Sequence, residues 1–213
     1  SKFSLSEITS YDFIKNNRNY LISLREKSYI LTLIMFTFFT IVWTLLLGFA
    51  MPIMLTAGFI FGKWFGTIFA CIGLATGAVF IYLFANFFFK DLIKEKFSKK
   101  FHWLYSNFKS NEFFYFLVYR AVGGIPFQIQ NFLPVLFNVK IMNYYFGTII
   151  GLAPQIFIWT SLGNGFEKII DKNLEAPSLK ELILSSEIYL PILGFIILLL
   201  LAIILRKKLY NNQ

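Results

Sequence analysis

The sequence predicts an all-α integral membrane protein with four transmembrane helices, two opposed re-entrant hairpins in an inverted repeat, and amphipathic surface helices. Hydrophobic residues make up 57% of the 213 residues and charged residues only 15%, whereas soluble domains carry about a quarter charged residues. Four segments lack charge over lengths that suit a helix crossing a bilayer. A fifth apolar segment contains glycines and prolines, which favour a broken hairpin over a simple span.

The apolar segments divide the chain into one membrane-embedded core and two flanking regions. We expect an amphipathic surface segment at 1–28, a core at 29–166, and a polar loop with a C-terminal transmembrane helix at 167–213. The charge-free run 28–62 exceeds the roughly 20 residues that one spanning helix needs. We therefore predict a re-entrant segment at 51–66, and spans at 29–50, 67–89, 141–162 and 187–205.

Glycines spaced by four residues predict helix faces that pack closely against neighbouring backbone, because small residues let two helices approach each other. Pro52 interrupts the helix at the start of the first hairpin. The glycines to which we assign close packing are Gly58, Gly62, Gly66, Gly73, Gly77, Gly147 and Gly151.

The segment 113–138 is predicted to form the second re-entrant hairpin and to contain the functional site. Its centre combines a permanently charged arginine, a glycine pair, two prolines and three amides within an apolar stretch. Broken backbone at membrane depth is tolerated only where protein buries it or where it lines an aqueous cavity. The residues expected to shape this hairpin are Gly123, Gly124, Pro126 and Pro134.

Arg120 is the candidate contact for a phosphate group, because its guanidinium can donate paired hydrogen bonds to phosphate oxygens. Gln128, Gln130 and Asn131 are candidates for neutral headgroup contacts, and Lys63 for a contact at the outer mouth. The alternatives are that Arg120 caps hairpin carbonyls, that the amides satisfy broken backbone, and that Lys63 only extends to the interface.

The distribution of basic residues predicts the orientation of the chain. Residues 1–28 carry five Lys/Arg, 90–112 six and 206–213 three, whereas the 163–187 loop has three against five acidic residues. With four spans, the three basic segments fall on one side, which the positive-inside rule makes cytoplasmic. We expect a multi-pass protein of the plasma (inner) membrane with both termini in the cytoplasm and hairpins that enter from opposite sides.

A shared tetrapeptide suggests an internal repeat. Residues 65–68 and 146–149 both read Phe-Gly-Thr-Ile, and Pro52 precedes the first copy about as far as Pro134 precedes the second. Chance is the alternative in a chain rich in these residues. Inverted repeats whose broken helices meet at the bilayer midplane are typical of transporters.

The charged residues argue against two functional classes. The net charge of +9 comes from residues that flank apolar segments, as membrane-flanking charges do, and not from a nucleic-acid-binding face. No Asp or Glu falls inside an apolar segment, and the single histidine, His102, lies in a surface segment. General acid–base chemistry and a metal cluster therefore lack residues at membrane depth. We expect no enzyme activity, no cofactor and no nucleic-acid partner.

Several short motifs together resemble one family. They are Arg120, Pro126 and Asn131, the run FGTIIGLAP at 146–154, Gly163, and the earlier runs AGFIFG at 57–62 and GLATGA at 73–78. Over residues 45–166 this pattern resembles the DedA superfamily, also called the VTT-domain or SNARE-associated Golgi protein family. The similarity is greatest to the bacterial branch related to the yeast late-Golgi vesicle protein.

The resemblance implies two re-entrant hairpins that face each other, and a role in moving lipids between leaflets. Family members are described as phospholipid scramblases or as recyclers of polyprenyl-phosphate carriers, and the arginine matched by Arg120 is functionally important. Three features depart from the family pattern: Gly123 and Gly124 replace a proline, Asn86 stands where an arginine is common, and no Asp or Glu lies between Lys27 and Lys90. The last feature puts proton coupling in doubt.

These observations lead to three functional hypotheses. The first is a scramblase or flippase for membrane lipids, with anionic phospholipid or polyprenyl phosphate as the partner of Arg120. The second is an ion- or solute-coupled secondary transporter, which needs a titratable site. The third is a non-transporting protein of membrane assembly or shaping. The sequence leaves the oligomeric state and the identity of the lipid open.

Overall fold

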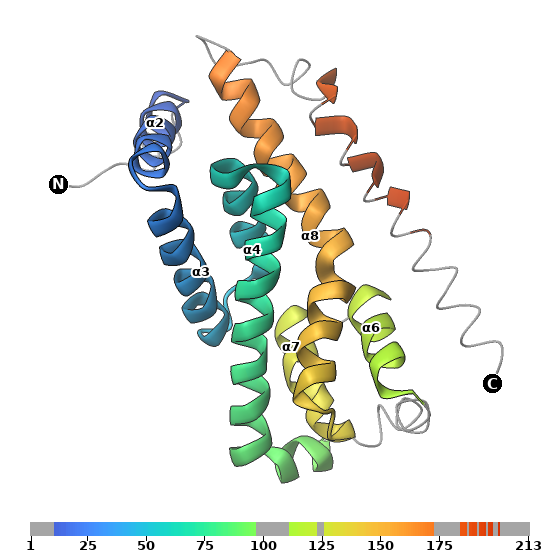
Figure 1. Ribbon diagram of the computed structural model, residues 1–213. Helices are drawn as coiled ribbons and strands as arrows, with labels where there is room; N and C mark the ends of the chain where they lie inside the picture. The colour runs from blue at the N-terminus through green and yellow to red at the C-terminus, as the bar shows by residue number, and fades with distance from the viewer. Residues whose placement is uncertain are drawn as a thin grey trace.

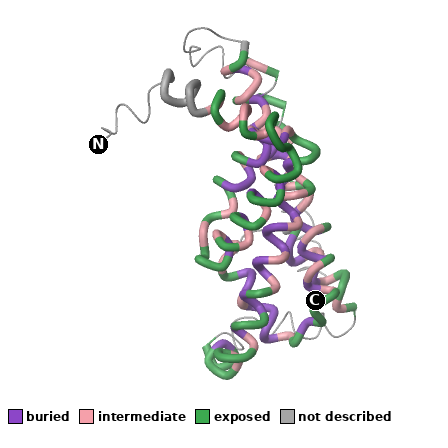
Figure 2. The backbone as a smooth tube through the Cα atoms, turned by 60° about the vertical axis from the view of Figure 1, so that its left-hand side comes forward, coloured by how far each residue is buried: buried purple, intermediate pink, exposed green. Residues whose placement is uncertain are grey.

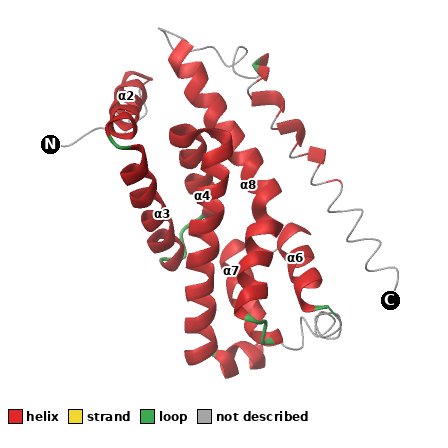
Figure 3. Cartoon of the chain, in the orientation of Figure 1, coloured by secondary structure: helices red, strands yellow, loops and turns green. Residues whose placement is uncertain are grey.

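The computed structural model describes residues 11–96, 111–122 and 126–172, together with residues 184–186, 188–190, 192–194, 196, 197 and 200. These residues form helices and connecting loops, and no strand occurs among them (Figure 3). The main elements are α2 (Tyr11–Lys27), α3 (Tyr29–Leu45), α4 (Ala50–Phe88), α6 (Glu112–Val122), α7 (Phe127–Phe132), the 3-10 helix η1 (Leu133–Phe137) and α8 (Ile141–Lys172) (Figure 1).

α4 is two helices joined by a reversal at Gly62, and Figure 1 shows the chain folding back at the upper end of this element. Gly62 has φ 76° and ψ 172°, a conformation that favours glycine. A Cβ placed on Gly66 would lie 2.6 Å from the carbonyl oxygen of Ala57. In a straight helix those two residues would be about 13 Å apart along the axis. The chain therefore folds back on itself, with a short arm at 50–61 and a long arm at 63–88.

The first hairpin consists of α3 and the short arm. α3 runs parallel to the long arm and ends beside Gly77, well before the long arm ends at Phe88. The short arm then returns towards Gly62. The contacts that define this course are Tyr29 with Phe65, Thr40 with Gly73, Thr44 with Gly77, and Phe36 with Phe61. The short arm thus returns along α3, and the chain reverses at Gly62 inside the predicted segment 51–66. The predicted re-entrant character of 51–66 and the predicted span at 29–50 stay predictions.

The long arm of α4 packs antiparallel to α8 and forms the centre of the fold. Contacts along the pair join Thr67 to Thr160, Ala78 to Tyr144, and Tyr82 to Val139. The short arm crosses α8 with backbone against backbone, because Gly58 lies on the main chain of Thr160 and Gly163 lies on the carbonyl oxygen of Leu55. Only glycine allows helices to approach this closely.

The second hairpin consists of α6 and the α7–η1 segment. α6 lies against α8 through Gly147, which faces Phe116, and Gly151, which faces Arg120. The Tyr119 hydroxyl donates to the carbonyl oxygen of Gln130 at 3.2 Å, so the two arms of the hairpin lie side by side. This hairpin opens at the end of α8 opposite to the end where the first hairpin opens. Gly123 and Gly124, expected to shape its turn, lie outside the described residues.

The two halves share a pattern of close glycine contacts, in a register that differs from the one suggested by the tetrapeptide, and the inverted repeat itself stays a prediction. Gly73 and Gly77 face the incoming helix of the first hairpin, as Gly147 and Gly151 face that of the second. Gly66 instead packs against the returning short arm. The two Phe-Gly-Thr-Ile copies therefore occupy different places in the two halves, and the glycine pairs define the structural correspondence.

Two described helices, Ala50–Phe88 and Ile141–Asp171, contain stretches long and apolar enough to cross a membrane. The pair Arg18–Lys27 and Tyr29–Leu45, bent by 117°, would be a third if it counts as one span. Many large apolar side chains are exposed on the described helices, and Figure 2 shows buried and exposed positions alternating along these helices. Residues 97–110 of the basic segment 90–112 and most of the predicted last span lie outside the described residues. Four transmembrane helices thus stay a prediction.

The basic segments lie at opposite ends of the fold. Arg18 of α2 forms ion pairs with Glu167 and Asp171 near the C-terminal end of α8. Lys90 follows the long arm of α4 at the other end, where it donates to Asn138. The described parts of residues 1–28 and 90–112 therefore lie at opposite ends of the α4–α8 pair, and the cytoplasmic placement of both segments stays a prediction.

The crossing of the short arm and α8 gives a stability prediction. Gly58→Ala should lower the free energy of unfolding by about 1–3 kcal/mol or more, because its Cβ would overlap the Thr160 main chain. Thermal unfolding in detergent measures the change. Gly194→Ala is the matched control, since its Cβ would meet Ile158 at an ordinary 3.8 Å. Equal midpoints for the two variants would contradict the close crossing.

The reversal at Gly62 gives a second prediction, with a different physical cause. A Cβ at this position would have room, since its nearest neighbour, Asn164 Oδ1, is 3.7 Å away. Gly62→Ala should still cost about 1–3 kcal/mol, because the backbone conformation disfavours any side chain. Gly62→Ser should cost a similar amount in the same thermal unfolding measurement. A cost that rises steeply with side-chain size would point to crowding instead of backbone strain.

Candidate functional site

Arg120 is the centre of the candidate site and is completely buried, with 0% of its surface exposed. It lies in the last turn of α6, one turn after Phe116, on the face that packs against α8. A Cβ placed on Gly151 would be 2.7 Å from the Arg120 Cβ. The absence of a side chain at Gly151 therefore creates the space through which the arginine enters the core.

Three neutral oxygens accept hydrogen bonds from the guanidinium. Nε donates to Thr148 Oγ1 at 3.1 Å, Nη1 to Asn131 Oδ1 at 2.9 Å, and Nη2 to the Tyr144 hydroxyl at 2.9 Å. Thr148 and Tyr144 belong to α8, and Asn131 belongs to α7. One side chain of α6 thus joins the returning arm of its own hairpin to the adjacent long helix.

Backbone carbonyls orient the two hydroxyl groups. The Thr148 hydroxyl donates to the carbonyl oxygen of Tyr144 at 2.6 Å, and the Tyr144 hydroxyl is 3.1 Å from the carbonyl oxygen of Ala78. Each hydroxyl has a single hydrogen, so donation to a carbonyl leaves its lone pairs directed at Arg120. Ala78 lies in the long arm of α4, which connects the network to the first half of the fold.

Aromatic rings surround the guanidinium where oxygens do not. Its central carbon lies 5.1 Å from the ring centre of Tyr144, 5.2 Å from that of Phe116 and 5.8 Å from that of Phe127. A cation over an aromatic face is stabilised by the negative potential of the ring. The rings therefore lower the cost of burying the charge without neutralising it.

The site retains a positive charge and an unused donor. Among the described residues, Arg120 forms no ion pair, and the ion pairs of this part of the chain belong to Arg18. Asn131 is 1% exposed, and its Nδ2 has no hydrogen-bond partner in the described structure. Its orientation is fixed, because turning the amide would direct Nδ2 at the guanidinium. A buried cation next to an unpaired N–H donor is an arrangement suited to an anion with several oxygens.

The other predicted contact residues lie at different distances from this centre. Gln128 Nε2 donates to the carbonyl oxygen of Leu47 at 3.3 Å, which places the start of α7 beside the turn of the first hairpin. Gln130 is buried, and its carbonyl oxygen accepts from Tyr119. Lys63 is exposed beside the Gly62 reversal, at the start of the long arm, whereas the Arg120 network meets the long arm at Ala78. The structure therefore does not bring Lys63 together with Arg120.

The prolines occupy positions where their missing N–H groups cost little. Pro52 is the third residue of α4, Pro126 is the N-cap of α7, and Pro134 stands in the first turn of η1. Within the described ranges, no group of three His, Cys, Asp or Glu side chains lies close enough together to hold a metal ion.

Sequence reasoning missed the α8 side of the site, namely Tyr144 and Thr148. Both are buried and follow each other by four residues, one on either side of Gly147. That spacing, next to a glycine pair, was a usable signal: polar side chains flanking a close helix contact face the neighbouring helix. Phe116 precedes Arg120 by four residues on α6 and likewise faces a glycine of α8, Gly147.

Comparison with known proteins shows the family of the chain. The VTT domain family model matches residues 48–165, more than half of the chain. The chain is also 27% identical over 179 residues to the transmembrane protein 41 homolog of Caenorhabditis elegans, covering 81% of this chain and 70% of the relative. No solved structure matches it. The matched region begins just before the short arm and contains the long arm, the second hairpin and most of α8. The chain is a membrane protein that belongs to the VTT domain family.

Proposed function

We propose that the protein moves lipid headgroups between the two leaflets of the membrane, with phospholipid or polyprenyl phosphate as substrate and Arg120 as the phosphate contact. The observation that supports this most directly is the complete burial of Arg120 against neutral oxygens only. Membership of a membrane protein family and the two hairpins also support a transport role.

A phosphate group fits the donors that the site presents. Hydrogen bonds from arginine to a charged phosphate are stronger than those to neutral oxygens. A phosphate oxygen could therefore replace Thr148, Tyr144 or Asn131 Oδ1 as acceptor, and a further oxygen could accept from Asn131 Nδ2. A carboxylate partner in place of Asn131 would compete with the substrate. The neutral acceptor set keeps the arginine oriented while leaving its charge for a ligand.

Access to Arg120 requires a change in the second hairpin. In the structure the guanidinium is closed off from the surface, so a headgroup reaches it only when α6 and α7 separate from α8. These are short elements of 11 and 6 residues. Their separation from α8 would exchange the Arg120 hydrogen bonds to Thr148 and Tyr144 for bonds to the headgroup. We place both hairpins inside the bilayer as segments that do not cross it, in the plasma (inner) membrane, and assign the protein no enzymatic step and no cofactor.

The first test is lipid redistribution in liposomes that contain the purified protein. The wild type should equilibrate a labelled phospholipid between leaflets, and Arg120→Ala should slow this at least tenfold, the effect of losing roughly 1.4 kcal/mol of headgroup interaction. Lys27→Ala, which removes a charge from exposed α2, should redistribute lipid at the wild-type rate. A wild type without any redistribution would remove lipid transport as the function.

The second test separates substrate binding from a purely structural role of Arg120. Asn131→Asp would give the arginine a carboxylate partner with almost the same shape. We expect it to keep or raise the thermal unfolding midpoint while slowing redistribution, because the carboxylate competes with phosphate. If Arg120 only holds the hairpin to α8, Asn131→Asp should redistribute lipid normally, and Arg120→Ala should reduce folded yield before it reduces rate.

A proton gradient applied across the same liposomes tests the competing mechanism. The described residues 50–88, 113–122 and 126–166 contain no Asp or Glu. We therefore expect the redistribution rate to be unchanged by the gradient. A rate that follows the gradient would favour an ion-coupled transporter.

A further inference from the structure

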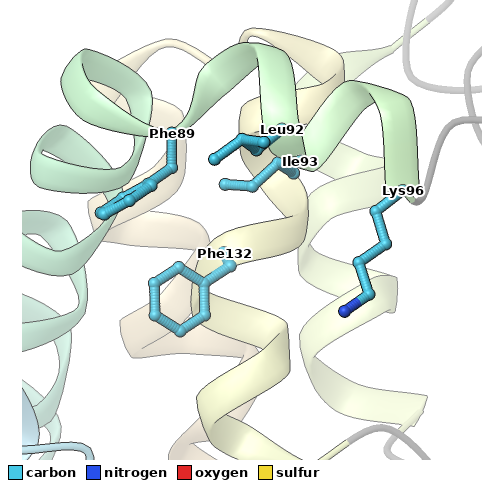
Figure 4. Close-up of a pocket in the computed structure, with 5 residues that line it drawn as sticks. All are labelled: Phe89, Leu92, Ile93, Lys96 and Phe132. Carbon is cyan, nitrogen blue, oxygen red and sulfur yellow. The ribbon is translucent and has the colours of Figure 1, made fainter.

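A groove lies between α7 and the helix at 90–96 that continues from α4 after a bend at Phe89 (Figure 4). Its volume is about 220 Å³. The described residues that line it are Phe89, Leu92, Ile93, Lys96 and Phe132. Figure 4 shows Phe132 below the 90–96 helix, with the lysine at one side of the apolar group.

We propose that this groove binds an anionic phospholipid, with part of an acyl chain between the 90–96 helix and Phe132 and the phosphate at Lys96. The inference rests on the proposed function, since it assigns the groove as the place where lipid is held before it reaches Arg120. Binding pockets for whole drug-sized ligands are usually larger, about 300–1,000 Å³. A groove of this size suits a segment of an acyl chain, with the remaining lipid in the bilayer.

The composition of the groove favours a lipid over a soluble ligand. Four of the five described lining residues are apolar, and one end carries a lysine whose charge complements a phosphate. The helix turns sideways from the end of α4 in Figure 1, as a helix at the membrane surface does. Lysines at 90, 94 and 96 outnumber the acids at 91 and 95. A basic helix of this kind attracts anionic lipid, at about 1 kcal/mol for each lysine near the surface.

The position of the groove connects it to the Arg120 network. Phe132 directly follows Asn131, the residue that accepts a hydrogen bond from Arg120. Ile93, on the groove wall, belongs to the same buried cluster as Phe116 and Tyr119 on α6. An acyl chain in the groove would therefore contact α7, one of the two elements that must separate from α8 to expose Arg120.

Lipid binding by the purified full chain in detergent tests the site without requiring transport. Native mass spectrometry with dioleoylphosphatidylglycerol and dioleoylphosphatidylcholine measures the affinity of the first bound lipid. The wild type should bind the anionic lipid more tightly. Lys96→Gln should weaken that binding about fivefold, the factor corresponding to ~1 kcal/mol, and leave phosphatidylcholine binding unchanged. Lys96→Arg should retain the preference.

Filling the groove tests the acyl-chain half of the proposal. Leu92→Trp should weaken binding of both lipids and slow redistribution of labelled phosphatidylglycerol in liposomes. Leu83→Trp, on the exposed surface of α4, is the matched control that should bind lipid as the wild type does.

The outcomes distinguish the groove from the proposed function. Wild-type lipid affinities in both Lys96→Gln and Leu92→Trp would overturn the groove as a lipid site, whatever the transport result. Unchanged affinity with a lowered unfolding midpoint would mean that the chain itself fills the groove, which also overturns it. If the Leu92→Trp protein loses lipid binding but still redistributes lipid normally, the groove does not hold lipid on its way to Arg120. Absence of redistribution by the wild type would refute transport, while the binding measurements would still decide the site.

Discussion

The burial of one positive charge among neutral oxygens is the constraint on which the core of this protein depends. A guanidinium removed from water needs acceptors for its N–H groups, and three oxygens from α7 and α8 supply them. Those oxygens need orientation, which the carbonyls of Tyr144 and Ala78 provide. The network thereby determines how α4, α6, α7 and α8 lie relative to one another. If Arg120 served only packing, an apolar side chain of similar volume would fill its place at a lower free-energy cost.

Glycine contacts meet a second requirement of the same core. Short helices bury little apolar surface each, so they gain most from close approach to a neighbour. The first hairpin achieves this where Gly58 and Gly163 meet backbone, and the second where Gly147 and Gly151 accommodate Phe116 and Arg120. The two halves use the same device, yet only the second places a charge at it. Thr44 occupies the place in the first half that Arg120 occupies in the second.

The sequence was sufficient to predict the all-helical membrane class, because hydropathy and charge report it directly, and its motifs were sufficient to predict the family. The sequence also singled out Arg120, which is fully buried in the structure. The course of the first hairpin was not predictable in the same way, because a charge-free run reveals its length but not where it reverses. Gly62 was assigned to packing because of its spacing, whereas its backbone conformation makes it the reversal itself. The orientation stays a prediction for a related reason: counting basic residues by side presupposes the number of crossings.

The Arg120 network has a consequence for how the protein is made. The acceptors Tyr144 and Thr148 follow the arginine by 24 and 28 residues, so the ribosome delivers the charge to the membrane before its partners exist. An isolated α6 is too short to cross a bilayer and would expose an unpaired cation there. We therefore expect the second hairpin to wait at the membrane surface until α8 has been inserted, and then to enter the bilayer against it.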